Sequence, residues 1–574
     1  MKKILSYLWP FWKTILLVVV FIIAQSLSEL FLPRLMSLIV DIGIANSDLE
    51  YVINQSFVMV LIAILAIFSA IMVAYFNTRL GTLAVKKLRS DVFDKIQQFS
   101  AQELDQFTPS SLITRSTNDI NQIQMLYTMM LRIIISAPLM AAGGFFLMLT
   151  QESSLSWIFL ILVPAVVVFI IGIFTYAKPR FEKIQNLVDT LNQVARQLLS
   201  GVRVIRAFNA QSSQSQLFVN QADKLKNENI HLNDVMSLIN PFFNIILNGS
   251  TILIMFVATP LVANLTLPVG SLMAFVQYTM QVMFAFIMLS FVFVFYPRAV
   301  VSAQRLSEVL NTPLSIQEVT QPEQFNDQDV SITFENVSFS YQDAKERVLN
   351  DLSFTIPAKT KTAIIGSTGS GKSTLVRLLP RFFDPIDGNI RFNNHDISKL
   401  GLEELRQLIG YIPQKASLFS GTIRFNLTLN NPSVNEEDLI TSIQMAQASS
   451  ILEEKEDGLD AEVTQKGSNL SGGQKQRLAI ARALAKHPKV LIFDDSFSAL
   501  DAITDKKVRE ALKALPNTTQ IIVSQKISSI VDCDQIIVLD EGSIVGIGNH
   551  ETLLKTSSVY KEIALSQNII EVTS

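Results

Sequence analysis

The chain has 574 residues, of which 49% are hydrophobic and 17% are charged, and its formal net charge at pH 7 is −3. Soluble domains carry about 25% charged residues, so this composition excludes an ordinary soluble enzyme. The charge balance gives no basic surface for nucleic acid, and the single cysteine, Cys533, excludes an intramolecular disulfide or a CxxC metal site.

The charged residues divide the chain into an N-terminal membrane half and a C-terminal soluble half. Only 37 of the first 310 residues are charged, against 60 of the remaining 264. A helix needs about 20 predominantly apolar residues to cross a bilayer. Six stretches meet this requirement, at about 14–40, 56–78, 127–149, 155–177, 240–263 and 269–296. We therefore expect an all-α, six-helix transmembrane domain over residues 1–310.

The loops between the predicted spans differ in their positive charge. Segments 41–55, 150–154 and 264–268 contain no Lys or Arg, whereas segments 79–126 and 178–239 contain six and eight. Lys and Arg close to membrane spans remain on the cytoplasmic side. We therefore expect a multi-pass protein of the cell membrane, with both termini, both long loops and the soluble half in the cytoplasm.

The two long loops are predicted to have structure of their own, because they far exceed ordinary helix connections. Apolar residues between 187 and 205 recur at three- and four-residue steps, which is typical of an amphipathic helix. Two short polar segments, 110–118 and 208–213, are suited to turn one long helix into the next. These turns are candidates for docking on the soluble domain.

Two features of the membrane half leave alternatives open. Glu29 and Arg34 lie within the first predicted span, where a solvated or mutually paired outer mouth and a substrate contact both explain them. The sixth span carries a polar and aromatic run that is suited to line a cavity for amphipathic solutes. Ordinary helix–helix hydrogen bonding explains its glutamines equally well. The run consists of Phe275, Gln277, Tyr278, Gln281 and Phe284.

Residues 311–329 are predicted to form a linker to a soluble domain over residues 330–574. Short strands are expected at 330–334 and 337–341, and a further strand at 362–365 runs into GSTGSGKST at 366–374. This is the P-loop pattern G-x-x-x-x-G-K-[ST], with a strand before it and an amphipathic helix after it. The sequence therefore predicts a nucleotide site.

Each residue type in the P-loop has a physical role. Glycines allow backbone N–H groups to surround the phosphates, Lys372 reaches the β- and γ-phosphates, and Ser373 ligates Mg²⁺. The predicted phosphate-binding residues are Gly366, Ser367, Thr368, Gly369, Ser370, Gly371, Lys372, Ser373 and Thr374.

A second predicted strand, 490–493, ends in Asp494, a position at which a carboxylate holds Mg²⁺ in P-loop proteins. Between the two motifs lies the pentapeptide LSGGQ at 470–474. With this pentapeptide the chain resembles the ATP-binding cassette (ABC) transporters of the exporter type, which have six spans followed by a fused cassette. The resemblance implies an α/β P-loop domain with a helical subdomain that carries the signature pentapeptide.

The resemblance also implies roles for residues that follow in the family's order. Tyr341 stands where an aromatic side chain stacks on adenine. Gln414 stands at the Q-loop glutamine, which contacts Mg²⁺ and senses the membrane domain. Residues 498–501 match the D-loop, and Gln525 falls at the switch-histidine position. The implied metal ligands are therefore Ser373, Gln414 and Asp494.

In this family two cassettes face each other head to tail, so one cassette cannot complete a site. The resemblance therefore implies a second chain with its own membrane half and cassette. Five residues of this chain would then complete the ATP site of that partner: Ser471, Gly472, Gly473, Gln474 and Asp501.

Two catalytic positions depart from the family pattern. Asp495 stands where hydrolytic sites carry a glutamate, and Gln525 replaces the switch histidine. Aspartate withdraws the carboxylate by about 1.5 Å, and a displacement of about 1 Å can cost ~10²-fold in rate. Glutamine has no titratable nitrogen. The catalytic positions Asp495, Gln525 and Gln414 are therefore expected to form a site that binds ATP and hydrolyses it poorly.

The resemblance thereby narrows to the degenerate-site subunit of heterodimeric bacterial multidrug exporters. It implies an ATP hydrolase that exports hydrophobic or amphipathic small molecules, with ATP and Mg²⁺ as cofactors. It further implies a different partner chain that retains the glutamate and histidine and has an altered signature. A lipid flippase or a peptide exporter of the same architecture stays open, and an ATP-gated channel or regulatory ABC protein is a remoter alternative.

Overall fold

The structure is a computed structural model of the chain, and it divides into two compact units. Unit 1 comprises Met1–Ile96 and Ser110–Thr312, and unit 2 comprises Gln97–Pro109 and Pro313–Ser574. The described residues are 1–151, 155–264, 266–325, 328–342, 344, 346–431, 434–515, 517–567 and 569.

Unit 1 is all-α, as the apolar stretches predicted. A short N-terminal segment, α1 (Lys2–Leu5) and a 3-10 helix (Ser6–Phe11), precedes the long helices. Six helical stretches of the described residues are long and apolar enough to cross a membrane, which confirms the predicted number of spans. Its helices are α2 (Trp12–Leu38), α3 (Leu49–Gln97), α5 (Pro109–Thr114), α6 (Ile120–Gln151), α7 (Trp157–Ser200), α8 (Val202–Ala207), α9 (Gln211–Ser237), α10 (Ile239–Ala263) and α11 (Val269–Asn311).

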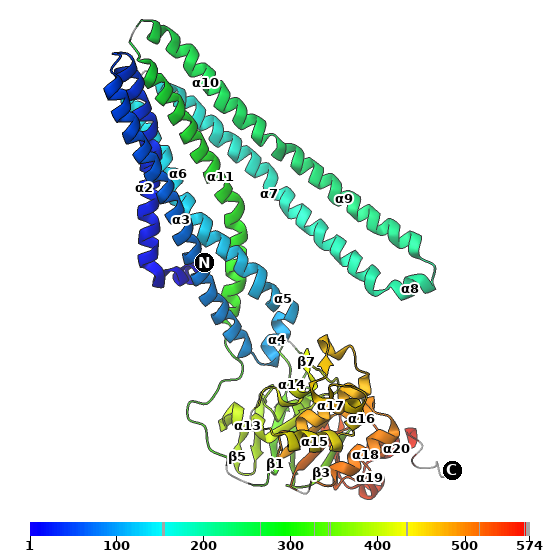
Figure 1. Cartoon of the computed structure of the whole chain (residues 1–574). Coiled ribbons are helices and arrows are strands. Elements are labelled where there is room, and N and C mark those ends of the chain that lie inside the picture. Colours follow the sequence, from blue (N-terminus) through cyan, green and yellow to red (C-terminus); the bar gives the residue numbers. More distant parts are fainter. Residues whose placement is uncertain are drawn as a thin grey trace. The chain divides into compact units, whose positions relative to one another are not determined.

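Helices α7 to α10 form a long hairpin that leaves the other helices of unit 1 along most of its length (Figure 1). At its base, Phe159 of α7 packs edge-to-face on Phe275 of α11, with the ring centroids 6.0 Å apart. Further along, Glu228 of α9 pairs with Arg180 and Lys183 of α7. At the tip, Phe208 is 79% exposed. Of the turn predicted at 208–213, residues 208–210 connect α8 to α9, whereas residues 211–213 already belong to α9.

The other predicted turn, at 110–118, is wrong. This segment is helical, because it contains α5 and most of a π-helical stretch, Arg115–Asp119. Its polar side chains bond within the helix: the hydroxyls of Ser116 and Thr117 donate to the carbonyls of Leu112 and Ile113. Serine and threonine favour turns through local hydrogen bonds, but here those bonds are made to the preceding helical turn.

Unit 2 contains an α/β domain built on two sheets. The six-stranded sheet has the order β12-β11-β3-β10-β9-β6 and is parallel except for the edge strand β12, whereas the sheet β2-β1-β4-β5 is antiparallel. A further small sheet pairs β7 with β8. The strands are β1 (Ile332–Phe339), β2 (Leu349–Ile356), β3 (Lys361–Ile365), β4 (Asp387–Phe392), β5 (His395–Asp396), β6 (Ile409–Ile412), β7 (Gly421–Thr422), β8 (Glu462–Val463), β9 (Val490–Asp494), β10 (Thr519–Val523), β11 (Gln535–Asp540) and β12 (Ser543–Gly548).

The helices of unit 2 complete the predicted α/β class. The two strands expected at 330–334 and 337–341 are one strand, β1, whose register shifts near Asn336. The helices are α4 (Ala101–Phe107), α12 (Lys372–Leu378), α13 (Leu402–Leu408), α14 (Ile423–Thr428), α15 (Glu436–Met445), α16 (Ser449–Glu453), α17 (Gly472–Leu484), α18 (Ala502–Leu512), α19 (His550–Thr556) and α20 (Ser558–Ser566).

Segment 97–109 packs with unit 2, although its position in the sequence predicts that it is part of the membrane half. The anchor is Glu103 of α4, which is only 4% exposed. Its carboxylate accepts hydrogen bonds from the N–H and the hydroxyl of Ser100 and from the N–H of Ser315, at 2.7, 2.5 and 2.8 Å. Ser315 belongs to the predicted linker, so this contact joins two stretches that are distant in sequence.

Replacing Glu103 with glutamine should loosen this junction. Burial raises the pKa of Glu103, but the hydrogen bonds from Ser100 and Ser315 outweigh it and leave the pKa below its ordinary value. The ionised group therefore stabilises the fold above the ordinary pKa of a glutamate, and this contribution is lost as pH falls through the lowered value. Hydrogen bonds to a charged group contribute about 1.5–3 kcal/mol.

We expect Glu103→Gln to lower the unfolding temperature and to speed protease cleavage between residues 97 and 109. The matched control is Asp105→Asn, the same change at an exposed position of the same helix. Equal protease sensitivity of the two variants would show that the Glu103 contact does not hold the segment.

Candidate nucleotide-binding site

The P-loop lies between β3 and α12, at the carboxyl end of a parallel strand. Its backbone requires glycine at two points. A Cβ on Gly366 would lie 2.0 Å from the carbonyl oxygen of Leu539. Gly371 has φ +96°, in the left-handed region, and a Cβ there would lie 2.7 Å from Leu349 Cδ2. These glycines let the loop pass close to the sheet and enter α12.

Lys372 is a buried cation at this loop. Its side chain is 7% exposed, and its ammonium group donates to the carbonyls of Gly366 and Ser367 at 2.9 and 2.6 Å. Burial lowers the pKa of Lys372. Within the described part of the chain, no carboxylate lies within ion-pair distance of its ammonium group. Because a buried charge is costly without a counter-ion, this arrangement fits an anionic phosphate group.

Asp494 and Ser373 lie together at the same edge of the sheet. The Ser373 hydroxyl donates to Asp494 Oδ1 at 2.6 Å, and the Tyr411 hydroxyl donates to Asp494 Oδ2 at 2.8 Å. Burial raises the pKa of Tyr411, so it remains a neutral donor. Hydroxyl and carboxylate oxygens are the ligand type that Mg²⁺ prefers. Sequence reasoning missed Tyr411, although it lies only three residues before Gln414 in the strand that leads to it.

Asp495 and Gln414 meet at this edge as well. Gln414 Nε2 donates to Asp495 Oδ2 at 3.1 Å, and the Asp495 N–H donates to the carbonyl of Val523 at 3.1 Å. Asp495 has φ +49°, in the left-handed region that Asp tolerates better than most residues. Burial raises the pKa of its carboxyl. The carboxylate is thus held by the Q-loop side chain.

Tyr341 and Gln525 occupy the margins of the site. The Tyr341 hydroxyl lies 3.0 Å from Thr374 Oγ1, and its ring packs edge-on against Phe383. Gln525 is exposed, two residues beyond the position in β10 where Val523 pairs with Asp494. In the described structure the Gln525 side chain makes no hydrogen bond. It is free to turn toward a bound nucleotide.

The signature residues begin α17. The Ser471 hydroxyl accepts from the N–H of Gln474 at 3.2 Å, and Gln474 Oε1 accepts from the N–H of Ser471 at 2.9 Å. A Cβ added to Gly472 would meet nothing within 4 Å. Asp501 caps α18 by accepting from the N–H of Thr504, which lowers the pKa of Asp501. Packing within this chain leaves room for a side chain at position 472, so it does not explain why a glycine stands there.

The structure thus assembles one group of predicted residues and leaves another apart. Hydrogen bonds connect Tyr341 with Thr374, Ser373 with Asp494, and Gln414 with Asp495. No hydrogen bond or ion pair of the described residues joins the signature residues, 471–474, or Asp501 to the P-loop.

Other residues that the sequence marked as candidates lie away from the nucleotide site. Cys533 is buried, and burial raises its pKa to about 12, so the thiol is inert. Glu29 accepts from Gln25 Nε2 at 2.9 Å and forms no ion pair with Arg34 in the described structure. Gln281 Nε2 donates to the Glu29 carbonyl at 3.0 Å.

The run in the sixth span is divided between two faces of α11. Phe275 and Tyr278 are buried, and the Tyr278 hydroxyl donates to the Leu30 carbonyl at 3.0 Å. Gln277 and Phe284 are exposed. The run as a whole therefore does not line one cavity within this chain.

Comparisons with known proteins find relatives along the whole chain. A family model described as ABC transporter transmembrane region matches residues 15–286, and one described as ABC transporter matches residues 349–498. An uncharacterized ABC transporter ATP-binding protein of Mycobacterium tuberculosis is 36% identical over 569 residues, covering 98% of this chain and 97% of that protein. The uncharacterized ABC transporter ATP-binding protein YfiB of Bacillus subtilis is 32% identical, covering 99% and 98%.

Two further matches concern export and architecture. A protein of Rickettsia conorii, named as an export ATP-binding/permease protein, is 29% identical and covers 98% of each chain. A solved structure described as a bacterial Atm1-family ABC exporter with ATP bound superposes with a TM-score of 0.80, at 24% identity, over 98% of this chain and 99% of that chain. This likeness shows that the two chains share a fold.

Proposed function

Because the chain belongs to the ABC transporter family, with a transmembrane region and an ATP-binding domain in one polypeptide, we propose that it is one half of an ATP-driven exporter of hydrophobic or amphipathic compounds. The name of the Rickettsia conorii relative supports export as the direction. Six apolar helices and bacterial relatives support a place in a bacterial plasma membrane. The distribution of Lys and Arg supports cytoplasmic termini and a cytoplasmic ATP-binding domain.

The observation that carries the proposal is the open start of α17. Gly472 faces no atom of its own chain within 4 Å of a Cβ position. In the described structure the cap of α17 uses the N–H of Gln474 and leaves the N–H groups of Gly472 and Gly473 to bind an anion. No hydrogen bond of the described residues joins this helix end to the P-loop. A phosphate presented by a second cassette would fit there, so a two-chain site explains both features.

On the P-loop side, this chain's residues would hold the phosphates and the metal. Lys372 would exchange its two carbonyl partners for β- and γ-phosphate oxygens, and Ser373, Asp494 and Gln414 would supply oxygen ligands for Mg²⁺. Bound Mg²⁺ neutralises charge on the phosphates during transfer. Tyr411 keeps Asp494 oriented by its hydrogen bond.

We infer that this site binds ATP and hydrolyses it slowly. Asp495 is shorter than the glutamate of hydrolytic sites, and its carboxylate is hydrogen-bonded to Gln414. Gln525 has no titratable nitrogen with which to take up or release a proton. Because two catalytic positions of this site carry residues that are poorly suited to hydrolysis, a partner chain that retains the glutamate and the histidine is favoured. A neighbouring reading frame that encodes such a partner would support this pairing.

Replacing Asp495 with asparagine should lower the ATPase rate of the assembled transporter less than about threefold. A correctly placed general base contributes about 10²–10⁴-fold, whereas a displaced one contributes little. Changing the partner's expected glutamate to glutamine should nearly abolish turnover. Steady-state phosphate release by the two reconstituted variants measures the difference, and equal losses would make Asp495 a working base.

The transport function itself is tested in liposomes. ATP-dependent accumulation of a hydrophobic cationic dye against its gradient supports the exporter. Passive flux that merely requires ATP would support a gated channel instead. ATP-dependent movement of a fluorescent phospholipid between leaflets, without dye accumulation, would support a lipid flippase.

A further inference from the structure

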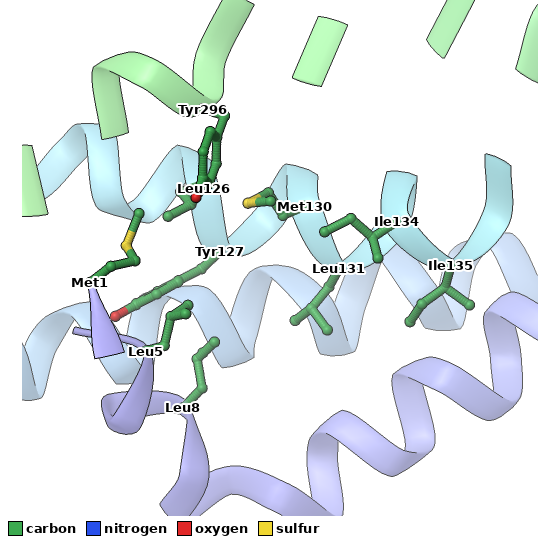
Figure 2. A pocket seen from close by; sticks show the side chains of 10 residues that line it. All are labelled: Met1, Leu5, Leu8, Leu126, Tyr127, Met130, Leu131, Ile134, Ile135 and Tyr296. Carbon is green, nitrogen blue, oxygen red and sulfur yellow. The ribbon is translucent and has the colours of Figure 1, made fainter. Parts of the chain in front are cut away.

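A pocket of about 280 Å³ lies in unit 1 beneath the N-terminal segment, residues 1–11. Figure 2 shows its walls: Leu5 and Leu8 come from that segment, Met130, Leu131 and Ile134 from α6, and Tyr296 from α11. Three elements that are distant in sequence thus line one partly open space.

The pocket is apolar. Its lining side chains are hydrocarbon or thioether apart from two tyrosines, and Tyr127 directs its hydroxyl to the Ile4 carbonyl, so that this polar group is already satisfied. A dry cavity of about 150 Å³ is large enough for benzene, and ligand pockets begin near 300 Å³. The space therefore suits a hydrocarbon chain, and the Tyr296 hydroxyl is the second polar group of its lining.

The N-terminal segment is fastened to the helices around the pocket. The Tyr7 hydroxyl donates to Asp91 of α3 at 2.8 Å, and Lys3 Nζ donates to Asn311 Oδ1 at the end of α11 at 2.6 Å. With the Tyr127 contact to α6, these bonds tie the segment to three helices. The ties hold the segment over the pocket, so the space does not close by a simple shift of the segment.

The surroundings of the segment are those of a membrane surface. Trp9 and Trp12 are 78% and 54% exposed, and tryptophan concentrates at the level of lipid headgroups. Lys2 and Lys13 are exposed and form no ion pair within the described residues. Lysines beside the cytoplasmic leaflet attract anionic lipids. The exposed lysines and the apolar pocket therefore both fit an anionic lipid.

We propose that this pocket binds one acyl chain of an anionic phospholipid from the cytoplasmic leaflet, with the lipid phosphate near Lys2 and Lys13. The chain fills the space between the N-terminal segment, α6 and α11. The lipid is a bound component of the membrane domain. This site is separate from the nucleotide site and from any transported compound.

The test uses the full-length transporter in vesicles of equal parts phosphatidylglycerol and phosphatidylcholine. The probe is phosphatidylglycerol with a diazirine near the end of one acyl chain, and peptide mass mapping locates the label. We expect label on Leu5, Met130, Leu131 or Ile134. Leu131→Trp, which fills the pocket, should reduce label there at least about fivefold. The matched control is Leu160→Trp on α7, where the side chain is exposed. This control should not reduce the label in the pocket.

Two further arms keep the proposal testable if Leu131→Trp does not fold. With the unaltered protein, unlabelled phosphatidylglycerol should compete for the pocket label better than phosphatidylcholine. Replacing Lys2 and Lys13 with alanine should reduce that preference by about fivefold for each lysine. Label spread evenly over exposed helices, or competition that is equal for the two lipids, would overturn the proposal. Displacement of the pocket label by the transported dye, but not by lipid, would also overturn it.

Discussion

The variant Gly472→Val is expected to reduce the ATPase rate of the assembled transporter by at least about 100-fold, the loss seen when one donor to a transition-state oxyanion is removed. The open space over Gly472 is needed only if a phosphate of the second cassette approaches the start of α17. A branched side chain would keep that phosphate out of hydrogen-bond range. Phosphate release by the purified two-chain transporter measures the loss.

Two controls separate a blocked interface from a damaged fold. Gly401 also lies at the start of a helix of unit 2, as the N-cap residue of α13, and a Cβ there would lie 3.6 Å from Pro322 Cβ, an ordinary contact. Gly401→Val should leave hydrolysis nearly unchanged. Gly472→Val should retain photolabelling of its own P-loop by an azido-ATP probe. Full ATPase activity in the Gly472 variant would contradict head-to-tail assembly.

Lys372→Ala should weaken ATP binding at this chain's P-loop by about 10–100-fold, because each hydrogen bond from a charged group contributes about 1.5–3 kcal/mol. The same change removes a buried cation that has no carboxylate partner in the described structure. We therefore expect the melting temperature without nucleotide to be maintained or raised. The stabilisation that ATP adds should decrease, since it depends on the ratio of ligand concentration to dissociation constant.

The control for this variant is Lys359→Ala. Lys359 precedes the opposite end of β3 and pairs with Asp329 at 2.9 Å on the surface. Its removal should change neither ATP binding nor the melting temperature appreciably, because exposed ion pairs contribute about 0–1 kcal/mol. An Lys372 variant that binds ATP as tightly as this control would rule out the phosphate role.

The class of fold and the family were predictable from the sequence because their signals are local. Membrane spans are predicted from the length of apolar stretches. The P-loop, the signature and the strand that ends in Asp494 each occupy a few consecutive residues. The bonds of Ser373 with Asp494 and of Gln414 with Asp495 could be expected as well, since these residues lie at or just beyond the carboxyl ends of parallel strands of one sheet. Whether the site is degenerate stays a prediction, since it rests on Asp495 and Gln525.

Features that depend on tertiary contacts were not predictable in the same way. The bond from Tyr411 to Asp494 requires β6 and β9 to be neighbours, and a tyrosine in a strand has no pattern of its own. The contact between Glu103 and Ser315 joins residues 212 positions apart. Its one local signal is the capping box of Ser100 and Glu103, which marks a helix start but not what the helix packs against.

The length of the hairpin of α7 to α10 would magnify any tilt at its base into a larger displacement at its tip. Helix α7 has 44 residues, which at 1.5 Å each span about 66 Å. A tilt of about 5° at the aromatic contact of Phe159 and Phe275 would carry the far end through roughly 6 Å, close to one helical pitch. The bending stiffness of α7 and α9 would determine how much of a tilt at the base reaches the tip of the hairpin. The ion pairs of Glu228 with Arg180 and Lys183 brace the two limbs against bending.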